Sequence, residues 1–428
     1  MAKLTSLEFV DYLRLSKLVA EDVLNRSLEE YRQERGGDLP LNAELVAILL
    51  IEAGLITRWH ADKIFDKKYK GFYLGKYKLL SHLGYGEMSS VYLAEHGLIK
   101  QLRAIKVLPK SRMFRSNSSH LHLFHLEAQA AASLDHPNLV RTFDVDNDGD
   151  QHFFVMEYID GKTLQTLVAE SGPLPLDVAC NLIAQAAEGL DYAHRHGVIH
   201  CDIKPANVMV DRQGLVRVLD LGLALHVNAW RESLAATHGE QILYTANYLS
   251  PEQALDSHHV DLRTDIYNLG CTLYFLLTGH PPFPAGSLVQ KVALHMRTMP
   301  VDVSRDRRDC PQDLSAICRK MLQKNPGLRY QNMGEVSEAL ESWLINHGFV
   351  FDPGAGDAAV ESAVRLKKSR VRSLIQSHPK TIQAATSREF PEFPVPAGDP
   401  PANRIFLACL VAMLLAVAAM IVWLMGIG

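Results

Sequence analysis

The sequence contains little cysteine, no block of basic residues and no apolar run near its start. Its six cysteines include no C-x-x-C pair, and no histidine pair accompanies them at zinc spacing. Reduced intracellular thiols are therefore expected, rather than a disulfide framework or a zinc site. A net charge of −4 without basic blocks argues against nucleic acid as a partner. Residues 1–17 lack the continuous apolar segment of a secretory signal peptide.

One long apolar run is nevertheless present, at residues 405–427. It contains no charged residue and no proline, and about 20 such residues suffice for a helix to cross a bilayer. A buried core helix is the alternative, but the approach through residues 390–403 is polar and rich in proline. We expect a transmembrane helix that inserts after synthesis as a tail anchor, with Arg404 and the basic residues 365–372 on the cytoplasmic side.

Residues 1–70 predict a small helical module. Asn42 and Thr57 are each placed to cap a helix, and Gly54 follows the first of these helices where it would stop. No group of catalytic residue types occurs in this module, and the module is a candidate docking site. Its first apolar stripe consists of Leu7, Val10, Leu13, Leu18 and Leu24.

From Tyr77 the pattern becomes alternating and rich in β-branched residues, and after Gly161 it becomes helical. A sheet-rich lobe is therefore expected over residues 77–161 and a helical lobe over 162–347. Residues 348–403 lose this periodicity and predict a linker, partly disordered and rich in proline. Strands are expected within 77–96, 102–110 and 152–159, and helices within 164–170 and 176–197.

A glycine-containing turn lies between two of the predicted strands. Gly84 and Gly86 would allow the backbone N–H groups of a hairpin to close over phosphate groups without a clash from Cβ. On its own this signal is weak, because most such turns are only turns. Ser89 stands at the third glycine of the pattern G-x-G-x-x-G, and it would be strained if a positive φ were needed there. The stretch comprises Leu83, Gly84, Tyr85, Gly86, Glu87, Met88, Ser89, Ser90 and Val91.

Lys106 is a charged residue in an otherwise apolar strand. A single lysine in a strand normally points to solvent, but a candidate partner exists for this one. Glu127, in the helical run 123–134, is the only acidic residue between Lys106 and Asp135. A lysine held by a carboxylate of a helix can bind the α and β phosphates of a nucleotide. This pairing is inferred from the order of the residues, not from geometry.

Four polar residues lie among apolar runs that predict short strands between positions 198 and 220. Asn207 and Asp220 offer oxygen atoms of the kind that Mg²⁺ prefers. Asp202 is placed to accept the proton of an attacking hydroxyl group, and Lys204 to steady a phosphoryl group in transfer. Ordinary turn residues are the alternative. Four such polar residues between buried strands, together with Lys106 and the glycine turn, favour a catalytic site over ordinary turns.

Taken together, these motifs resemble the bacterial serine/threonine protein kinases (eukaryotic-like, Hanks-type) over about residues 77–347. "GYGEMSSV" is similar to their glycine-rich loop, "RAIK" to their lysine strand and "DLG" to their metal-binding D-F-G. "SPE" at 250–252 resembles A-P-E, and Asp265 in "DIYNLG" resembles the aspartate that braces the catalytic loop. The resemblance also pairs Arg329 with Glu252.

The resemblance implies an α+β fold: a bilobal protein kinase with a β-rich N-lobe and a helical C-lobe, placed between the helical module and the transmembrane helix. It implies transfer of the γ-phosphoryl group of ATP, with Mg²⁺, to serine or threonine hydroxyls of protein substrates. Lys204 and Thr245 favour these acceptors over tyrosine. The hinge that contacts adenine through its backbone would comprise Met156, Glu157 and Tyr158. Such a membrane-anchored kinase would keep its catalytic domain in the cytoplasm, where ATP is available.

Cys201 departs from the family pattern, which has arginine before the catalytic aspartate. That arginine receives a phosphate of the activation loop, and cysteine lacks the charged fork to do so. Control through phosphorylation of the candidate acceptors Ser233, Thr237 and Thr245 is therefore in doubt, whereas catalysis by Asp202 does not depend on residue 201. A reactive thiol is the less favoured alternative, since aliphatic neighbours suggest burial.

Two other functions stay open. A pseudokinase that binds nucleotide and acts as a scaffold would fit Ser89 and Cys201, but degenerate kinases usually lose at least one of the residues that bind or transfer phosphate. A kinase of small molecules, such as an antibiotic phosphotransferase, would share the catalytic aspartate but typically lacks segments like "SPE" and "DIYNLG".

Overall fold

The computed structural model of the chain describes residues 4–35, 37–85, 89–108, 129, 131–220, 246–255 and 260–349. The chain divides into two compact units, Met1–Pro379 and Lys380–Gly428, and all described residues belong to the first. Glu127, the expected linker beyond residue 349 and the expected transmembrane segment 405–427 lie outside the described residues. Among the helices that are described, none is both long and apolar enough to cross a membrane.

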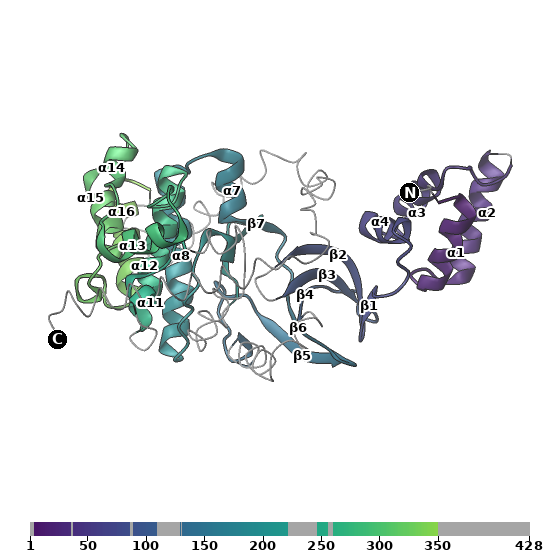
Figure 1. Ribbon diagram of the computed structural model, residues 1–428, viewed down its shortest axis with the longest axis horizontal. Coiled ribbons are helices and arrows are strands. Elements are labelled where there is room, and N and C mark those ends of the chain that lie inside the picture. Colours follow the sequence, from purple (N-terminus) through teal and green to yellow (C-terminus); the bar gives the residue numbers. More distant parts are fainter. Residues whose placement is uncertain are drawn as a thin grey trace, which may run out of the picture. The chain divides into compact units, whose positions relative to one another are not determined.

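The N-terminal module is built of helices, as its sequence predicts. Asn42 caps α3 by accepting a hydrogen bond from the N–H of Glu44 at 3.0 Å, and Thr57 caps α4. The module has an apolar core of its own, in which Phe9, Leu50 and Ile64 are fully buried. Its helices are α1 (Ser6–Ser16), α2 (Glu21–Arg35), α3 (Ala43–Glu52) and α4 (Arg58–Phe65) (Figure 1).

One member of the predicted apolar stripe is wrong. Leu7 is 67% exposed, whereas Val10 and Leu13 are buried. Because an α-helix has 3.6 residues per turn, the buried face of α1 runs through Phe9, Val10 and Leu13, and Leu7 projects to the side of it. The predicted stripe, with residues three apart, did not include Phe9, which lies on the buried face of α1.

The β-rich lobe is an antiparallel sheet in the order β1-β2-β3-β4-β6-β5. The three predicted strand regions become β2 with β3, β4, and β6. β5 was not predicted, because "TFDVDND" is acidic and pairs with β6 at one edge of the sheet. The strands are β1 (Tyr73–Leu74), β2 (Tyr77–Tyr85), β3 (Ser90–His96), β4 (Leu102–Val107), β5 (Thr142–Asp148) and β6 (Gln151–Glu157).

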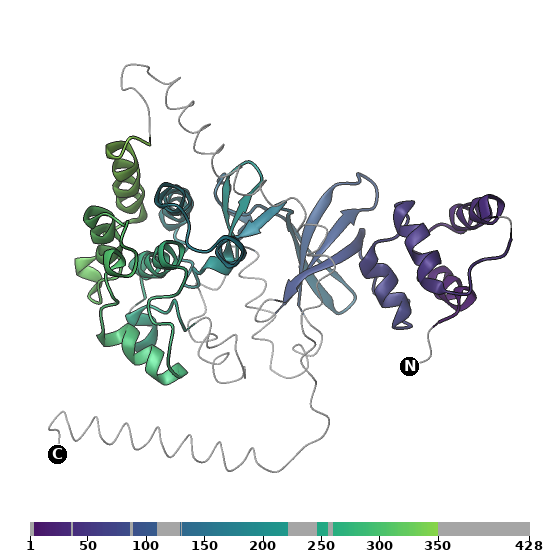
Figure 2. The same ribbon diagram turned by 90° about the horizontal axis from the view of Figure 1, so that it is seen from above.

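The C-lobe packs around α8 (Leu176–Arg195) and α12 (Leu262–Thr278), which are buried over most of their circumference. α8 packs along α16 (Met333–Asn346) and against β9 of a small sheet, β7-β8-β9. Figure 2 shows the helices of this lobe, teal to green, gathered together. The other elements of this lobe are β7 (Gly161–Thr163), α7 (Leu164–Ser171), η1 (Pro205–Asn207), β8 (Val208–Asp211), β9 (Val216–Val218), α11 (Pro251–Leu255), α13 (Leu288–Arg297), α14 (Val303–Asp306), α15 (Gln312–Met321) and η3 (Pro326–Leu328).

Backbone hydrogen bonds join the two lobes next to β9. The N–H of Val140 donates to the oxygen of Val218 at 2.9 Å, and the N–H of Val218 donates to the oxygen of Asn138 at 2.9 Å. Leu139, between them, belongs to the core of the C-lobe. This junction fixes the end of β9 relative to the chain that enters the sheet, two residues before Asp220.

Candidate active site

The loop that carries Asp202 is held by the buried carboxylate of Asp265 in α12. Asp265 accepts from the backbone N–H of His200 at 2.8 Å and from that of Cys201 at 2.7 Å. His194 donates to the same carboxylate at 2.8 Å. Burial alone would raise the pKa of Asp265, but the bonds from His194 and the His200 backbone outweigh it and hold this pKa below its usual range. The carboxylate therefore stays charged and braces the loop, as the resemblance implied.

The same bonds explain why residues 198–200 form no strand, although their aliphatic sequence predicted one. The backbone N–H of His200 is bound by Asp265 instead of a neighbouring strand. His200 also donates from its ring Nε2 to the oxygen of Leu219 at 2.7 Å and accepts at Nδ1 from the N–H of Asp202. The segment is therefore an irregular loop pinned at several points, which suits a catalytic loop better than a strand would.

Cys201 has a left-handed backbone conformation, with φ of 61°. Such a conformation costs a non-glycine residue about 1–3 kcal/mol, and here both backbone groups are fixed. Its N–H binds Asp265, and its oxygen accepts from Gln253 Nε2 at 2.6 Å. The side chain is buried, and burial raises the pKa of the thiol well above its usual range. A reactive thiolate is therefore not expected at this position.

Asp202, Lys204 and Asn207 form a compact group of buried side chains. Lys204 Nζ lies 2.8 Å from Asp202 Oδ2, and Asn207 Nδ2 donates to the backbone oxygen and to Oδ2 of Asp202, each at 2.9 Å. Because the amide nitrogen of Asn207 faces Asp202, its amide oxygen faces the other way. The N–H of Leu219 binds the backbone oxygen of Asn207 at 2.8 Å, which brings the segment leading to Asp220 alongside the loop.

Lys106 of β4 reaches Asp220, and its Nζ lies 2.8 Å from Asp220 Oδ1. Burial would raise the pKa of Asp220, but the ammonium groups of Lys106 and Lys204 lower it below its usual range. Asp220 also has a positive φ of 55°, which aspartate tolerates better than most residues. The predicted partner of Lys106, Glu127, lies outside the described residues.

β2 and β3 carry the residues on either side of the glycine turn. Gly84 pairs with Val91 and Tyr85 with Ser90, and residues 86–88 lie outside the described residues. Ser89 is buried and has no positive φ, so the strain considered for a serine at this position does not arise. Its Oγ finds no hydrogen-bond partner in the part of the chain that the structure describes.

The predicted hinge comprises the last two residues of β6 and the residue that follows them. Met156 is buried within this strand and pairs with Ala104 of β4. The N–H of Glu157 donates to the oxygen of Arg141 at 2.9 Å. Tyr158 is half-buried, and this burial raises the pKa of its phenol. The hinge backbone thus continues directly from the strand next to the one that carries Lys106.

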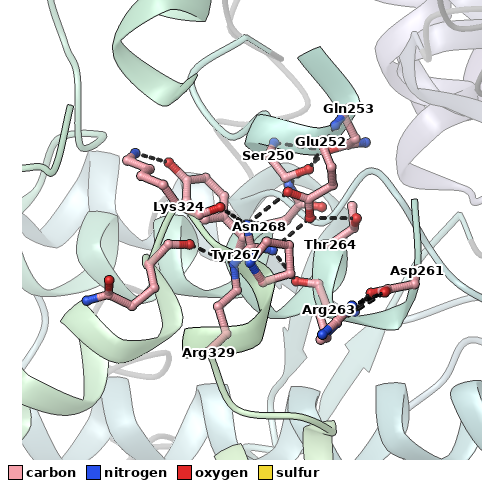
Figure 3. A network of polar contacts seen from close by, with 12 residues as sticks. Ser250, Glu252, Gln253, Asp261, Arg263, Thr264, Tyr267, Asn268, Lys324 and Arg329 are labelled. Atoms are coloured by element: carbon pink, nitrogen blue, oxygen red, sulfur yellow. Dashed lines mark hydrogen bonds and ion pairs between the residues drawn. The ribbon is translucent and has the colours of Figure 1, made fainter. Parts of the chain in front are cut away.

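Another buried ion pair ties α11 to the segment after α15. Arg329 donates to Glu252 through Nη1 at 2.7 Å and through Nη2 at 2.9 Å (Figure 3). Thr264 Oγ1 donates to Glu252 Oε1 at 2.8 Å. The pairing of Arg329 with Glu252 that the resemblance implied is therefore present. The guanidinium also donates to the backbone oxygens of Arg263, Gln323 and Lys324.

Gln253 is a connecting residue that the sequence did not reveal. Its amide oxygen accepts from the N–H of Ser250 at 3.0 Å and from Asn268 Nδ2 at 3.2 Å (Figure 3). Its amide nitrogen donates to the backbone oxygen of Cys201. It therefore links α11 and α12 to the loop of Asp202. A single glutamine next to "SPE" has no spacing signature, and nothing in the sequence pointed to it.

The residues that meet here fit a magnesium nucleotide. The carboxylate of Asp220 and the amide oxygen of Asn207 are the hard oxygen ligands that Mg²⁺ takes. Lys106 and Lys204 add positive charge beside Asp220, which suits phosphate groups. The buried Oγ of Ser89 offers a hydroxyl in the same lobe as Lys106. The donor set thus matches both a hard cation and a polyphosphate.

The chain belongs to the protein kinase family, whose protein kinase domain matches residues 77–344, more than half of the sequence. This family uses ATP and Mg²⁺. The chain is similar to the serine/threonine-protein kinase PknB of Mycobacterium leprae, with 40% identity over 265 residues that cover 61% of this chain and 42% of that protein. It is 34% identical over 268 residues to the serine/threonine-protein kinase PrkC of Bacillus subtilis, covering 63% of this chain and 40% of that protein.

The chain therefore spans less than half the length of these curated relatives. Among solved structures it resembles the crystal structure of the Mycobacterium tuberculosis PknI kinase domain. The TM-score is 0.50 at 26% identity, and the match covers 64% of this chain and 98% of that chain. The bilobal fold with a β-rich N-lobe and a helical C-lobe is therefore that of a protein kinase.

Proposed function

We propose that this chain is an ATP-dependent serine/threonine protein kinase that transfers the γ-phosphoryl group to hydroxyl groups of proteins. The observation that carries the proposal is the meeting of residues from both lobes at one site. Lys106 of the sheet lies 2.8 Å from Asp220, and Asp202 lies within hydrogen-bond reach of Lys204 and Asn207. The kinase names of the curated relatives support the same activity.

In this proposal Asp202 is the general base. Its carboxylate would accept the proton of the attacking hydroxyl, a role that needs a fixed and ionised acceptor close to the nucleophile. Lys204, which neutralises Asp202 Oδ2 at 2.8 Å, would stabilise negative charge on the phosphoryl group in transfer. Such preorganised charge in a buried site contributes strongly to catalysis.

The nucleotide would be held from both lobes. Lys106 would bind the α and β phosphates, with Glu127 as the residue that fixes its ammonium group. The loop Leu83–Val91 would cover the phosphates, and the backbone of Glu157 and Tyr158 would contact adenine. Asn207 and Asp220 would hold Mg²⁺, which supplies neutralisation of the phosphate charge when it is bound.

The substrate class can be tested directly. Full-length protein in detergent is incubated with γ-labelled ATP, Mg²⁺ and a generic protein, and the label is assigned to amino acids after hydrolysis. We expect label on serine and threonine. Bound nucleotide without transfer would instead favour a scaffold, and label on added small hydroxyl compounds alone would favour a small-molecule kinase.

We also propose that residues 405–427 anchor the kinase in a membrane, with residues 1–404 on the cytoplasmic side. The support is the uncharged apolar composition of this run, which at 1.5 Å per residue would extend about 35 Å as a helix. A helix lying on the membrane surface would need a charged face, which this run lacks. Full-length protein should sediment with membranes and resist extraction by high salt, whereas a variant truncated after Asn403 should stay in solution. Full-length protein that stays soluble without detergent would refute this part of the proposal.

A further inference from the structure

Two side chains at the start of α4 bond to two consecutive carbonyl groups of β2. Thr57 Oγ1 donates to the oxygen of Leu80 at 2.5 Å, and the ring Nε2 of His60 donates to the oxygen of Leu79 at 2.6 Å. The same side chains also cap α4. Thr57 Oγ1 accepts from the N–H of His60 at 3.2 Å, and His60 Nδ1 accepts from the N–H of Thr57 at 3.0 Å. We call this set of four bonds the α4 clamp.

The bonding pattern fixes the state of His60. Because Nδ1 accepts a hydrogen bond, the ring proton must lie on Nε2, the atom that faces the carbonyl group of Leu79. Burial lowers the pKa of His60 to about 4, so the ring is neutral at physiological pH. A neutral ring in this tautomer uses both of its nitrogen atoms within the clamp.

The clamp acts where β2 is irregular. Leu79 pairs with Ala94 of β3 and Ser81 with Leu93, so that Leu80 is an extra residue in β2, and a second bulge follows between His82 and Gly84. Consecutive carbonyl groups of a regular strand point in opposite directions. A bulge breaks this alternation, which allows the oxygens of Leu79 and Leu80 both to face the module. The register of a bulged strand is not set by the ladder alone, and here donors from α4 complete it.

Other contacts hold the same strand. Lys78 Nζ donates to the oxygen of Leu18 at 3.0 Å, where the C-terminal end of α1 favours a positive charge. Trp59 packs edge-on against Tyr92 of β3. The contact between the module and the sheet is not closely packed throughout, because a cavity of about 310 Å³, lined by residues of the module and of the sheet, includes Thr57 and His60 in its wall. Discrete polar bonds therefore set much of the fit between module and sheet.

β2 is also the strand that leads into the glycine turn. Gly84 lies four residues beyond Leu80, about 13 Å along an extended chain, and it pairs with Val91 across the hairpin. We propose that Thr57 and His60 are positioning residues for the nucleotide: the clamp fixes the first of the two bulges of β2 and thereby the course of the strand toward Gly84, where the glycine turn begins. This inference rests on the proposed kinase function. It assigns the N-terminal module a part in nucleotide binding, although no residue of the module belongs to the site.

The chain offers a matched control for a test. Thr5 caps α1 in an equivalent capping box with Glu8, but its hydroxyl bonds within its own helical turn and not to the sheet. Thr57→Val and Thr5→Val each remove one helix cap of the module, and Thr57→Val alone also removes the bond to Leu80. Thr57→Ser restores the hydroxyl group. The three variants are made in the full-length protein.

The readouts are the dissociation constant of ATP with Mg²⁺, the KM for ATP and kcat. We expect Thr57→Val to raise the dissociation constant and the KM about 3- to 10-fold, the factor that corresponds to one net hydrogen bond, with kcat nearly unchanged. Thr57→Ser and Thr5→Val should bind ATP like the wild type. Equal ATP binding by Thr57→Val and the wild type would overturn the inference, as would an equal loss in Thr5→Val.

If Thr57→Val does not fold, His60→Gln takes its place, because it removes the ring that donates to the oxygen of Leu79. It should weaken ATP binding in the same direction, and unchanged binding would overturn the inference. A different result would refute the proposed function. Wild-type protein that binds ATP but transfers no phosphoryl group would refute the kinase activity, while the dissociation constants of the variants would still decide whether the clamp positions the nucleotide.

Discussion

Replacing Arg329 by methionine would leave the carboxylate of Glu252 buried without its cation. The side chain of Arg329 is fully buried and that of Glu252 is 8% exposed. Methionine has a similar length and no charge, so the change removes two hydrogen bonds to Glu252 and those to three backbone oxygens, with little loss of volume. The substitution therefore tests the ion pair more than the packing.

Removal of one partner of a buried ion pair costs about 3–5 kcal/mol in unfolding free energy, because the other charge stays desolvated. For a kinase domain of this size we expect Arg329→Met to lower the Tm by about 10 °C. Arg263→Met serves as the control. Its ion pair with Asp261, with an N–O distance of 2.6 Å, is partly exposed, and such pairs contribute at most about 1 kcal/mol to the unfolding free energy.

The pH dependence of this loss has a definite sign. In the wild type the pKa of Glu252 is lowered, since the bond from Arg329 outweighs the opposing effect of burial. The ion pair therefore adds stability above the ordinary glutamate pKa, and this contribution is lost as pH falls through the lowered value. In Arg329→Met only the hydrogen bonds from Thr264 and the backbone still oppose the effect of burial, so the pKa of Glu252 should rise. Protonation of Glu252 should then lessen the loss of stability in the variant as pH falls.

Urea unfolding of both proteins at pH 7 and near pH 5 measures the effect. The difference in unfolding free energy should be largest at pH 7 and should shrink toward pH 5. A difference below about 1 kcal/mol at pH 7, or one that does not change with pH, would refute the reasoning, because a buried charge left without its partner must show both effects.

Three further outcomes are expected. The pKa of His60 is lowered to about 4, so between pH 4 and about 6.5 the unfolded chain binds a proton that the folded chain does not, and the unfolding free energy should fall by about 2 kcal/mol from pH 7 to 5. Urea unfolding of the module, monitored by its proteolysis, should show this fall, and His60→Gln should remove the pH dependence. Phosphatase treatment should leave most activity, since Cys201 cannot bind a phosphate; a collapse of activity in a Ser233→Ala, Thr237→Ala double variant would contradict this. Asp220→Asn should lower the transfer rate by about 10²-fold or more while the protein stays folded, although loss of the ion pair with Lys106 lowers its Tm, and a rate equal to that of the wild type would exclude Asp220 as a metal ligand.

The parts of the fold that the sequence predicted are those with a local pattern. Helix caps such as Asn42 and Thr57 stand next to the helices they begin, and alternating aliphatic residues marked β2 and β4. The position of Lys106 within an apolar strand was informative for the same reason. These features depend on neighbours in the chain, which a single sequence displays.

What the sequence did not predict depends on partners that lie far apart in the chain. Gln253 binds a backbone oxygen 52 residues away, and His194 binds a carboxylate 71 residues away. The aliphatic segment 198–200 has the composition of a strand, and the bonds of His200 to Asp265 of α12 and to Leu219 hold it as a loop. β5 is polar because it pairs at an edge of the sheet. The clamp at His60 looked like an ordinary helix start, because its second set of bonds goes to a strand some 20 residues later.

The most direct test of the account compares wild-type protein with Asp202→Asn in a single experiment with labelled ATP, Mg²⁺ and a protein substrate. Asparagine keeps the size of the side chain and removes its capacity to accept a proton. We expect the wild type to label serine and threonine, and Asp202→Asn to bind ATP with similar affinity while its transfer rate falls by about 10²-fold or more. Equal transfer rates in the two proteins, or ATP bound by the wild type with no transfer at all, would contradict the assignment of this site as that of an active protein kinase.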